Sequence, residues 1–435
     1  MRRLPTIALA GLVVALRPSA GLGGEPAPPP GTLTLQQAQA FALAHHPEIQ
    51  AALLRAQAAG AAVREARAAY FPQVLGTATA AAAGSDTRIA APAALNNPTV
   101  FQRESNGLLV SQLLTDFGRT SSLTASARFQ AESTSQTAEA VRARVLLDVN
   151  HAFFGVLGAK AVLKVADETV GERRLVLDRV NALAKASLKS SLDVSFAEVA
   201  LGEARLLLLR AQDDLQAAHA RLATALGVRD AAPRELVDEP LFPVPSEDVE
   251  ELIRSALDAR PELRAARAQT EAARRLASAE KAAQYPVVSA LGAVGFSPYR
   301  DDRLTSTYSA AGVIVSVPLF TGGRLSARAQ EAQLQAGAYE RILDDAENRI
   351  QQDVRIAWLA ARTAREAMEV TRATLESASR ALELAQSRYE LGISSIVELS
   401  QAQLQKTQAD IADAAARYEY QQRRADLDFQ IGVRH

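Results

Sequence analysis

The sequence contains one structural unit twice. The segment His46–Ile49 returns as Arg260–Leu263, each with a Pro followed by a Glu, and Tyr70–Pro72 returns as Gln284–Pro286 at the same spacing. A slightly shorter spacing then holds to the C-terminus, so the first copy has a longer loop after Pro72. A register kept over this distance predicts two equivalent units. The later matches are Gly118-Arg119 with Gly323-Arg324, Asp148-Val149 with Asp353-Val354, and Gly227-Val228 with Gly432-Val433.

Each copy contains a helix-forming stretch that is too long for an ordinary globular domain. The two stretches cover about Arg119–Ala186 and Arg324–Glu390. At about 1.5 Å per residue, each would span roughly 100 Å. Apolar residues recur at three- and four-residue steps, as at Val141, Val145 and Val149, which predicts coiled-coil-like packing. Aromatic residues make up only 5% of the chain, so we expect thin, Ala-lined seams and no bulky core.

Between the helices of each copy, residues with high β-propensity predict a pair of strands. β-Branched residues fill most of Val313–Val317, and Thr77 and Thr79 alternate with alanines. Turn-forming and charged residues separate the two strands of each pair. The expected hairpins cover about 73–117 and 287–320, with polar loops at 84–106 and 297–307.

Four strands from one chain cannot close a barrel. Open strand edges are not viable in lipid, because their backbone N–H and C=O groups find no water to bond. A membrane barrel needs at least about eight strands, so three chains with about twelve strands form the smallest ring that closes comfortably. The sequence therefore predicts an oligomer.

The first residues have the pattern of an export signal. Arg2 and Arg3 precede the mainly apolar run Leu4–Leu16 and a small-residue stretch, which is typical of a secretory signal peptide. No later segment offers roughly 18–20 consecutive apolar residues, so an exported chain would be soluble or inserted as a β-barrel. The expected divisions are a signal peptide at 1–20, a Pro/Gly-rich linker at 21–33, a first repeat at 34–230 with its helical hairpin at 119–226, a linker at 231–246, and a second repeat at 247–435 with its helical hairpin at 323–432.

The composition excludes several kinds of chemistry. The chain has no Cys, which rules out disulfides, Cys-ligated zinc, iron–sulfur clusters, thiol catalysis and a lipid on an N-terminal Cys. Its five His residues lack ligand spacing, and no phosphate-binding, zinc-protease or serine-hydrolase motif occurs. The net charge of −1 gives no case for nucleic-acid binding. We therefore expect no catalytic residue, no metal site and no cofactor.

Several motifs mark the boundaries of the predicted elements. They are the amphipathic start Leu35–Ala44, the helix-ending Phe71-Pro72 and Tyr285-Pro286, the strand-to-helix corners Leu113–Arg119 and Pro318–Arg324, and the helix–helix turn Arg388–Leu399. In these motifs and their order, nearly all of the mature chain resembles the TolC-type outer membrane efflux protein family. The resemblance implies a fold that is mainly α with a small β part. It would be a trimeric α-helical barrel continuous with a 12-stranded outer-membrane β-barrel, to which each chain contributes four strands.

The resemblance also implies a function and partners. The barrel would sit in outer-membrane lipid, and most of the chain would form a tunnel in the periplasm. The helix–helix turns would meet a periplasmic adaptor protein and, through it, an inner-membrane pump that supplies the energy. A periplasmic coiled-coil structural or adaptor protein without a pore is the alternative. Such adaptors usually have one helical hairpin, whereas this sequence predicts two, each with its own strands.

The turns between the long helices are the expected docking sites. Gly392 lies where two antiparallel helices reverse, and glycine tolerates the positive φ of such a turn. The resemblance implies adaptor docking by Gly392, Ile393 and Ser394, with a merely structural turn as the alternative. The first copy has Ser187 and Leu188 at its turn, and the missing glycine leaves the docking role of that turn open.

Four residues near the turns are the expected pore and gate residues. By the resemblance, Glu398 lies inside the periplasmic mouth, where three copies would form a ring that attracts cations, with Gln401 on the same face. Asp193 is the counterpart of Glu398 in the first copy, and a helix-start acid favoured by the helix dipole is the alternative for both. Tyr389 is similar to a tyrosine that latches the mouth in relatives, but Ser394 replaces the arginine expected beside it.

Overall fold

The structure is a computed structural model that describes residues 32–81, 103–229, 235–244, 246, 248–300 and 305–433. The predicted signal peptide at 1–20 lies outside these residues, as do most of the 21–33 linker and part of the 231–246 linker. The elements in chain order are α1 (Leu35–His45), α2 (Pro47–Ala68), β1 (Gln73–Ala81), β2 (Arg103–Thr115), α3 (Arg119–Lys185), α4 (Ser191–Leu226), α5 (Val249–Ala259), α6 (Pro261–Ala282), β3 (Val287–Arg300), β4 (Thr307–Ser316), α7 (Arg324–Glu390) and α8 (Ile396–Gln430).

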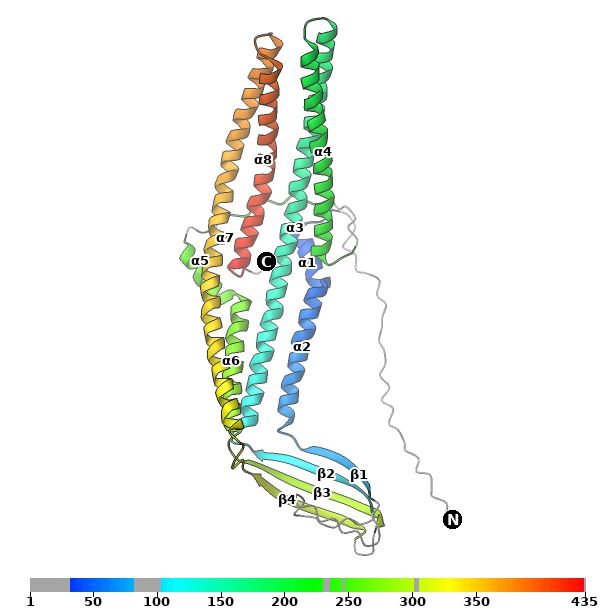
Figure 1. The fold of residues 1–435 in the computed structure, drawn as a ribbon, viewed down its shortest axis with the longest axis vertical. Helices are drawn as coiled ribbons and strands as arrows, with labels where there is room; N and C mark the ends of the chain where they lie inside the picture. Colours follow the sequence, from blue (N-terminus) through cyan, green and yellow to red (C-terminus); the bar gives the residue numbers. More distant parts are fainter. Residues whose placement is uncertain are drawn as a thin grey trace, which may run out of the picture.

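The molecule is a long rod of helices with a small sheet at one end (Figure 1). α3 and α7 run nearly its whole length, and both have 67 residues. α2 and α6 pack along the half nearer the sheet, whereas α4 and α8 pack along the half that ends in the two helix–helix turns. The short helices α1 and α5 lie near the middle of the rod. The predicted fold class, mainly α with a small β part, is confirmed.

The four strands form one antiparallel sheet in the order β1-β2-β3-β4. The two hairpins therefore lie side by side, joined between β2 and β3 from Arg103 opposite Arg300 to Thr115 opposite Val288. The predicted polar loops were too long, because residues 103–106 and 297–300 belong to strands. Polar side chains do not prevent a ladder, since its hydrogen bonds join backbone groups. The outer edges of β1 and β4 have no strand partner among the described residues.

Two supporting helices are stacked end to end beside each long helix, α4 and α2 beside α3, and α8 and α6 beside α7. α4 ends at Gly227, where an added Cβ would lie 2.8 Å from Cδ of Pro47, the first residue of α2. α8 ends near Gly432, where an added Cβ would lie 3.0 Å from Cβ of Ala259, just before α6. Both glycines have φ of +76°. The recurring Gly and Pro motifs thus mark the two junctions at which one supporting helix follows another.

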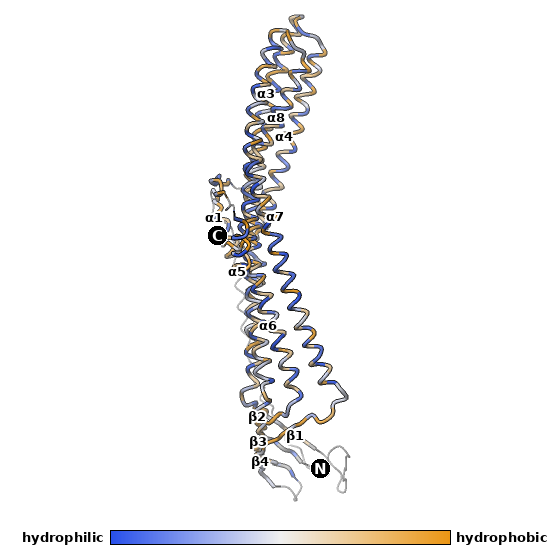
Figure 2. The backbone as a smooth tube through the Cα atoms, turned by 90° about the vertical axis from the view of Figure 1, so that its left-hand side faces the viewer, coloured by the Kyte–Doolittle hydropathy of each residue, from blue (hydrophilic) through white to orange (hydrophobic). Residues whose placement is uncertain are grey.

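The thickest core lies at the middle of the rod, where α1 packs against α3 and α4. Phe153 and Phe154 of α3 are almost fully buried there. The sequence has no long uninterrupted apolar run after its N-terminus, but α3 contains an 18-residue window of mean hydropathy 1.4, which is enough to cross a membrane by length and composition. Val145 and Val149 of α3 also lie in this core, and part of the apolar window is buried inside the protein. Elsewhere apolar and polar residues alternate along the long helices (Figure 2).

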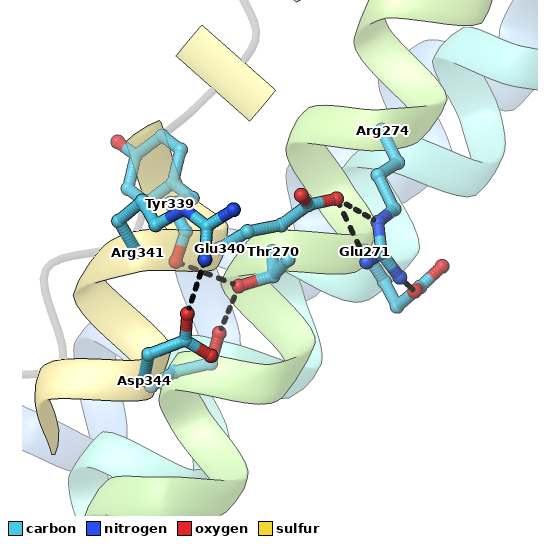
Figure 3. Close-up of polar contacts among 8 residues, drawn as sticks. Thr270, Glu271, Arg274, Tyr339, Glu340, Arg341 and Asp344 are labelled. Carbon is cyan, nitrogen blue, oxygen red and sulfur yellow. Dashed lines mark hydrogen bonds and ion pairs between the residues drawn. The ribbon is translucent and has the colours of Figure 1, made fainter. Parts of the chain in front are cut away.

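Ion pairs hold α6 against α7 (Figure 3). The Arg274 guanidinium lies 2.8 Å from the Glu340 carboxylate and also contacts Glu271 on its own helix. Nearby, the buried hydroxyl of Thr270 lies 3.0 Å from the carbonyl oxygen of Ala266 and 3.3 Å from that of Tyr339. In the first repeat Gly60 occupies the position equivalent to Arg274, so this ion pair has no counterpart there. The two halves therefore share a backbone plan but differ in the chemistry of their seams.

The junction at Gly227 generates a stability prediction. Gly227→Ala should destabilise the protein by about 1–2 kcal/mol or more, because a non-Gly residue is strained at positive φ and its Cβ meets Pro47. Denaturant unfolding followed by circular dichroism measures this difference. Gly202→Ala within α4 is the control, since nothing lies within 4 Å of the added carbon; helix propensity predicts no loss there. Equal stability of both variants would contradict the stacked junction.

Candidate functional site at the helix turns

The two helix–helix turns at the end of the rod have the same backbone conformation. Ser187 takes the left-handed φ of +58°, and Gly392 at the matching position has φ of +73°. In each turn two backbone N–H groups return to carbonyls of the preceding helix, in the pattern of a Schellman cap. The serine therefore does not alter the shape of the first turn. The bonds are Ser187 N to Ala184 O (2.9 Å), Leu188 N to Leu183 O (2.9 Å), Gly392 N to Tyr389 O (3.1 Å) and Ile393 N to Arg388 O (2.9 Å).

Large apolar side chains are exposed on both turns. Leu188 is 69% exposed and Ile393 is 64% exposed. Leu192 and Val397, the second residues of the following helices, are also exposed. Ser394 differs from these neighbours, because its hydroxyl is buried and has no hydrogen-bond partner among the described residues. Clustered apolar exposure at both turns is typical of a surface that binds another protein.

The first acidic candidate, Asp193, caps a helix. Its carboxylate accepts hydrogen bonds from the backbone N–H of Ser190 (2.9 Å) and from the Ser190 hydroxyl (2.7 Å). The backbone N–H of Asp193 donates in return to the Ser190 hydroxyl, which completes a capping box. Although burial opposes it, the hydrogen bonds from Ser190 and the charge of Lys189 lower the pKa of Asp193. Asp193 thus keeps its charge and orders the start of α4.

The second acidic candidate, Glu398, has a different partner. Its backbone N–H bonds the Ser395 hydroxyl, but its carboxylate lies 3.1 Å from Nε of Arg388 at the end of α7. Both side chains of this pair are about half exposed. Gln401 is also exposed and lies three residues further along the same helix face. Glu398 and Gln401 therefore lie together on the surface of the α8 start.

Tyr389 connects the two helical hairpins. It is only 4% exposed and packs with Val180 of the first hairpin and Leu399 of its own. The Lys189 ammonium of the first turn lies 3.7 Å from the Tyr389 ring centroid and 3.4 Å from its carbonyl oxygen. Burial, and then the nearby negative charge of Asp193, raise the pKa of Tyr389 to about 12. The tyrosine is therefore neutral at any physiological pH.

Other contacts between the hairpins are also polar. Arg179 of α3 pairs with Glu390 of α7, and Glu172 of α3 lies 3.6 Å from Lys406 of α8. Burial lowers the pKa of Arg173, which remains charged and donates to the Thr407 hydroxyl at 3.2 Å. A cavity of about 430 Å³ lies between the hairpins and is lined by Glu172, Arg179 and Glu390 together with Tyr389 and several Leu and Val side chains. The hairpins thus meet through polar pairs beside apolar contacts.

Sequence reasoning missed three cations at this site. Lys189, Arg179 and Arg388 contact Tyr389, Glu390 and Glu398 respectively. One signal could have found the first of them, since the repeat spacing places Lys189 at the position equivalent to Ser394. The second copy has Ser394 and no cation at this position, and Lys189 of the first copy contacts the Tyr389 ring. Among the described residues, no group of His, Asp and Glu side chains is placed to hold a metal ion.

The Lys189 contact predicts a local change in stability. Lys189→Met removes a cation–π contact worth about 0.5–2 kcal/mol, so amide hydrogen exchange in both turns should become about two- to thirtyfold faster. Hydrogen–deuterium exchange mass spectrometry measures this rate. Lys185→Met in the last turn of α3 is the matched control. If both variants exchange like the unmodified protein, Lys189 does not hold the hairpins together.

Comparisons with known proteins identify relatives along most of the chain. The pattern of the outer membrane efflux protein family matches residues 40–228 and 252–433. Protein CyaE of Bordetella pertussis is 30% identical over 391 residues, which cover 87% of this chain and 80% of CyaE. Outer membrane protein OprJ of Pseudomonas aeruginosa is 28% identical over 381 residues, with 83% and 76% covered.

Solved structures share the fold. A membrane protein from Pseudomonas aeruginosa superposes with a TM-score of 0.81 at 25% identity, covering 92% of this chain and 90% of that protein. The outer membrane protein VceC of Vibrio cholerae superposes with a TM-score of 0.79 at 19% identity, covering 92% and 96%. VceC and this chain therefore share one fold over nearly their whole lengths.

Proposed function

Because the chain belongs to the outer membrane efflux protein family, we propose that it is the outer-membrane channel component of a tripartite efflux or type I secretion system. It conducts substrates passively toward the exterior from a periplasmic adaptor and an inner-membrane pump. The observation that carries this proposal is the four-stranded sheet with two open edges at the end of helices of 67 residues. A periplasmic coiled-coil protein without a pore would have no use for such a sheet.

The sheet is suited to a bilayer only as part of a closed ring. Each unpaired backbone group costs several kcal/mol in hydrocarbon, so β4 of one copy must pair with β1 of the next. Three copies supply twelve strands from the four of each chain. Exposed aromatic side chains lie where the strands join the helices, which resembles the aromatic girdles at the interfaces of membrane barrels. These are Phe71, Phe117, Tyr285 and Phe320.

The edges of the helical layer also favour a homotrimer. In the half nearer the sheet, the helices pack in the order α2, α3, α6 and α7, so α2 and α7 are the two edges. Leu54 of α2 and Leu334 and Ile342 of α7 are more than half exposed. Joining one copy's α7 to the next copy's α2 would cover these side chains, and this head-to-tail contact closes into a ring.

The turns form the periplasmic entrance of the tunnel in this proposal. Three copies of Glu398 and Gln401 line it, while Asp193 orders the first turn. Tyr389, held by Lys189 and close to Asp193, keeps the two hairpins together when the entrance is closed. Leu188 and Ile393 bind the periplasmic adaptor. No catalytic role is assigned to any residue, in keeping with a family of transport channels.

Ion conduction tests the pore. Purified trimers in planar bilayers should conduct, and Glu398→Ala should lower the ratio of potassium to chloride permeability by about two- to fivefold, because a carboxylate near a narrow pore favours cations. The reversal potential in a KCl gradient gives this ratio. Glu376→Ala, an exposed acid further down α7, is the control and should leave the ratio unchanged. An unchanged ratio in Glu398→Ala would remove Glu398 from the pore.

Adaptor binding tests the turns. Ile393→Asp should weaken the complex with the adaptor more than about tenfold, since a buried apolar anchor commonly contributes at least about 2 kcal/mol to an interface. Binding to the immobilised adaptor measures the loss. The same variant should still conduct in bilayers, which separates docking from pore formation. Undiminished adaptor binding would show that the second turn is only structural.

A further inference from the structure

The two equivalent acids at the turns are electrically different. The carboxylate of Asp193 is used by the backbone and hydroxyl of Ser190 in its own helix cap. The carboxylate of Glu398 is not part of a capping box and instead lies 3.1 Å from Nε of Arg388. Glu398 is therefore not an uncompensated negative charge in this turn. Glu398 has a counter-charge from its own protomer.

The pair depends on a residue that only the second copy has. The position equivalent to Arg388 in the first copy is Leu183, which bears no charge. Arg388 lies in the last turn of α7, and Glu398 lies in the first turn of α8. An arginine at a helix C-terminus and an acid at a helix N-terminus are each favoured by the helix dipole. Both residues are therefore held in place independently, and the turn brings them together.

We propose that Arg388 sets the ion selectivity of the entrance by compensating the charge of Glu398. The inference rests on the proposed function, in which three copies of Glu398 ring the pore. With three arginines beside three carboxylates, the ring has no net formal charge and only a weak preference for cations. The compensation also reduces the repulsion that three clustered carboxylates would otherwise exert. Arg388 is thus a specificity-determining residue, because it sets the net charge that permeating ions meet at the ring of Glu398 carboxylates.

Charge removal in planar bilayers tests the proposal. Arg388→Gln should raise the potassium-to-chloride permeability ratio about two- to fivefold, because three uncompensated carboxylates then attract cations. Glu398→Gln should shift the ratio in the opposite direction, and the double variant should return close to the unmodified value. The shift should be much smaller in 1 M than in 0.1 M salt, because the screening length falls from about 10 Å to about 3 Å. Arg372→Gln, an exposed residue further down α7, is the matched control and should change nothing.

Restoring a positive charge at position 388 with a chemical reagent tests the proposal without relying on Arg388→Gln alone. The chain contains no Cys, so Arg388→Cys provides one reactive thiol per protomer. A methanethiosulfonate reagent with a quaternary ammonium group should lower the permeability ratio toward that of the unmodified protein. The matching sulfonate reagent should raise the ratio further. Both measurements use the same folded, membrane-inserted protein before and after modification.

The outcomes separate this inference from the proposed function. Protein that forms no channels at all would overturn the proposed function itself. Channels whose selectivity is unchanged or lowered by Arg388→Gln, and indifferent to the charge attached to the introduced thiol of Arg388→Cys, would overturn only the role of Arg388. A raised ratio in Arg388→Gln, reversed by the positive reagent in Arg388→Cys, supports the compensation.

Discussion

Backbone hydrogen bonding at the outer edges of β1 and β4 governs the rest of the structure. Each edge strand has a partner on one side only among the described residues, and a membrane offers no water to satisfy the other side. In the proposed trimer, pairing between copies closes the sheet. One end of each strand is joined to a long or supporting helix. Closure of the sheet in that trimer would therefore arrange the helices of neighbouring copies around the same axis.

The duplicated unit solves a second problem, the support of two helices of 67 residues each. α4 and α2 pack in succession along α3, and α8 and α6 pack along α7. The glycines at 227 and 432 allow the supporting helices to meet end to end. Near the turns the hairpins contact each other through an apolar cluster that includes Val180 of the first and Tyr389 of the second, and through polar pairs such as Arg179 with Glu390. Apolar packing therefore acts both within and between the hairpins, and the polar pairs add to it between them.

Local signals explain how much of the fold could be predicted from the sequence. Pro47 and Pro261 are the first residues of helices, and Gly118 and Gly323 immediately precede the two long helices. Each of these residues determines the helix start through its own backbone conformation. The strands extended further than their β-branched residues indicated, because ladders such as Glu104 opposite Tyr299 need only backbone groups. At the candidate site, the turns and their acids were predictable, but their partners were not. Lys189 meets Tyr389 only because two hairpins pack at one particular rotation, and no local pattern encodes that rotation.

In the proposed trimer, three copies close one sheet through the edges of β1 and β4. Disulfide cross-linking tests it directly, since the chain has no Cys of its own. One Cys at Thr77 in β1 would be combined with one Cys at each successive position of β4 in turn, and a bond forms only when the two Cα atoms lie within about 7 Å. We expect one register of β4 to yield a covalent species of three chains in outer-membrane preparations, and the neighbouring registers to cross-link only weakly. Failure of every register to cross-link, or an unlimited ladder of larger species, would contradict a closed ring of three.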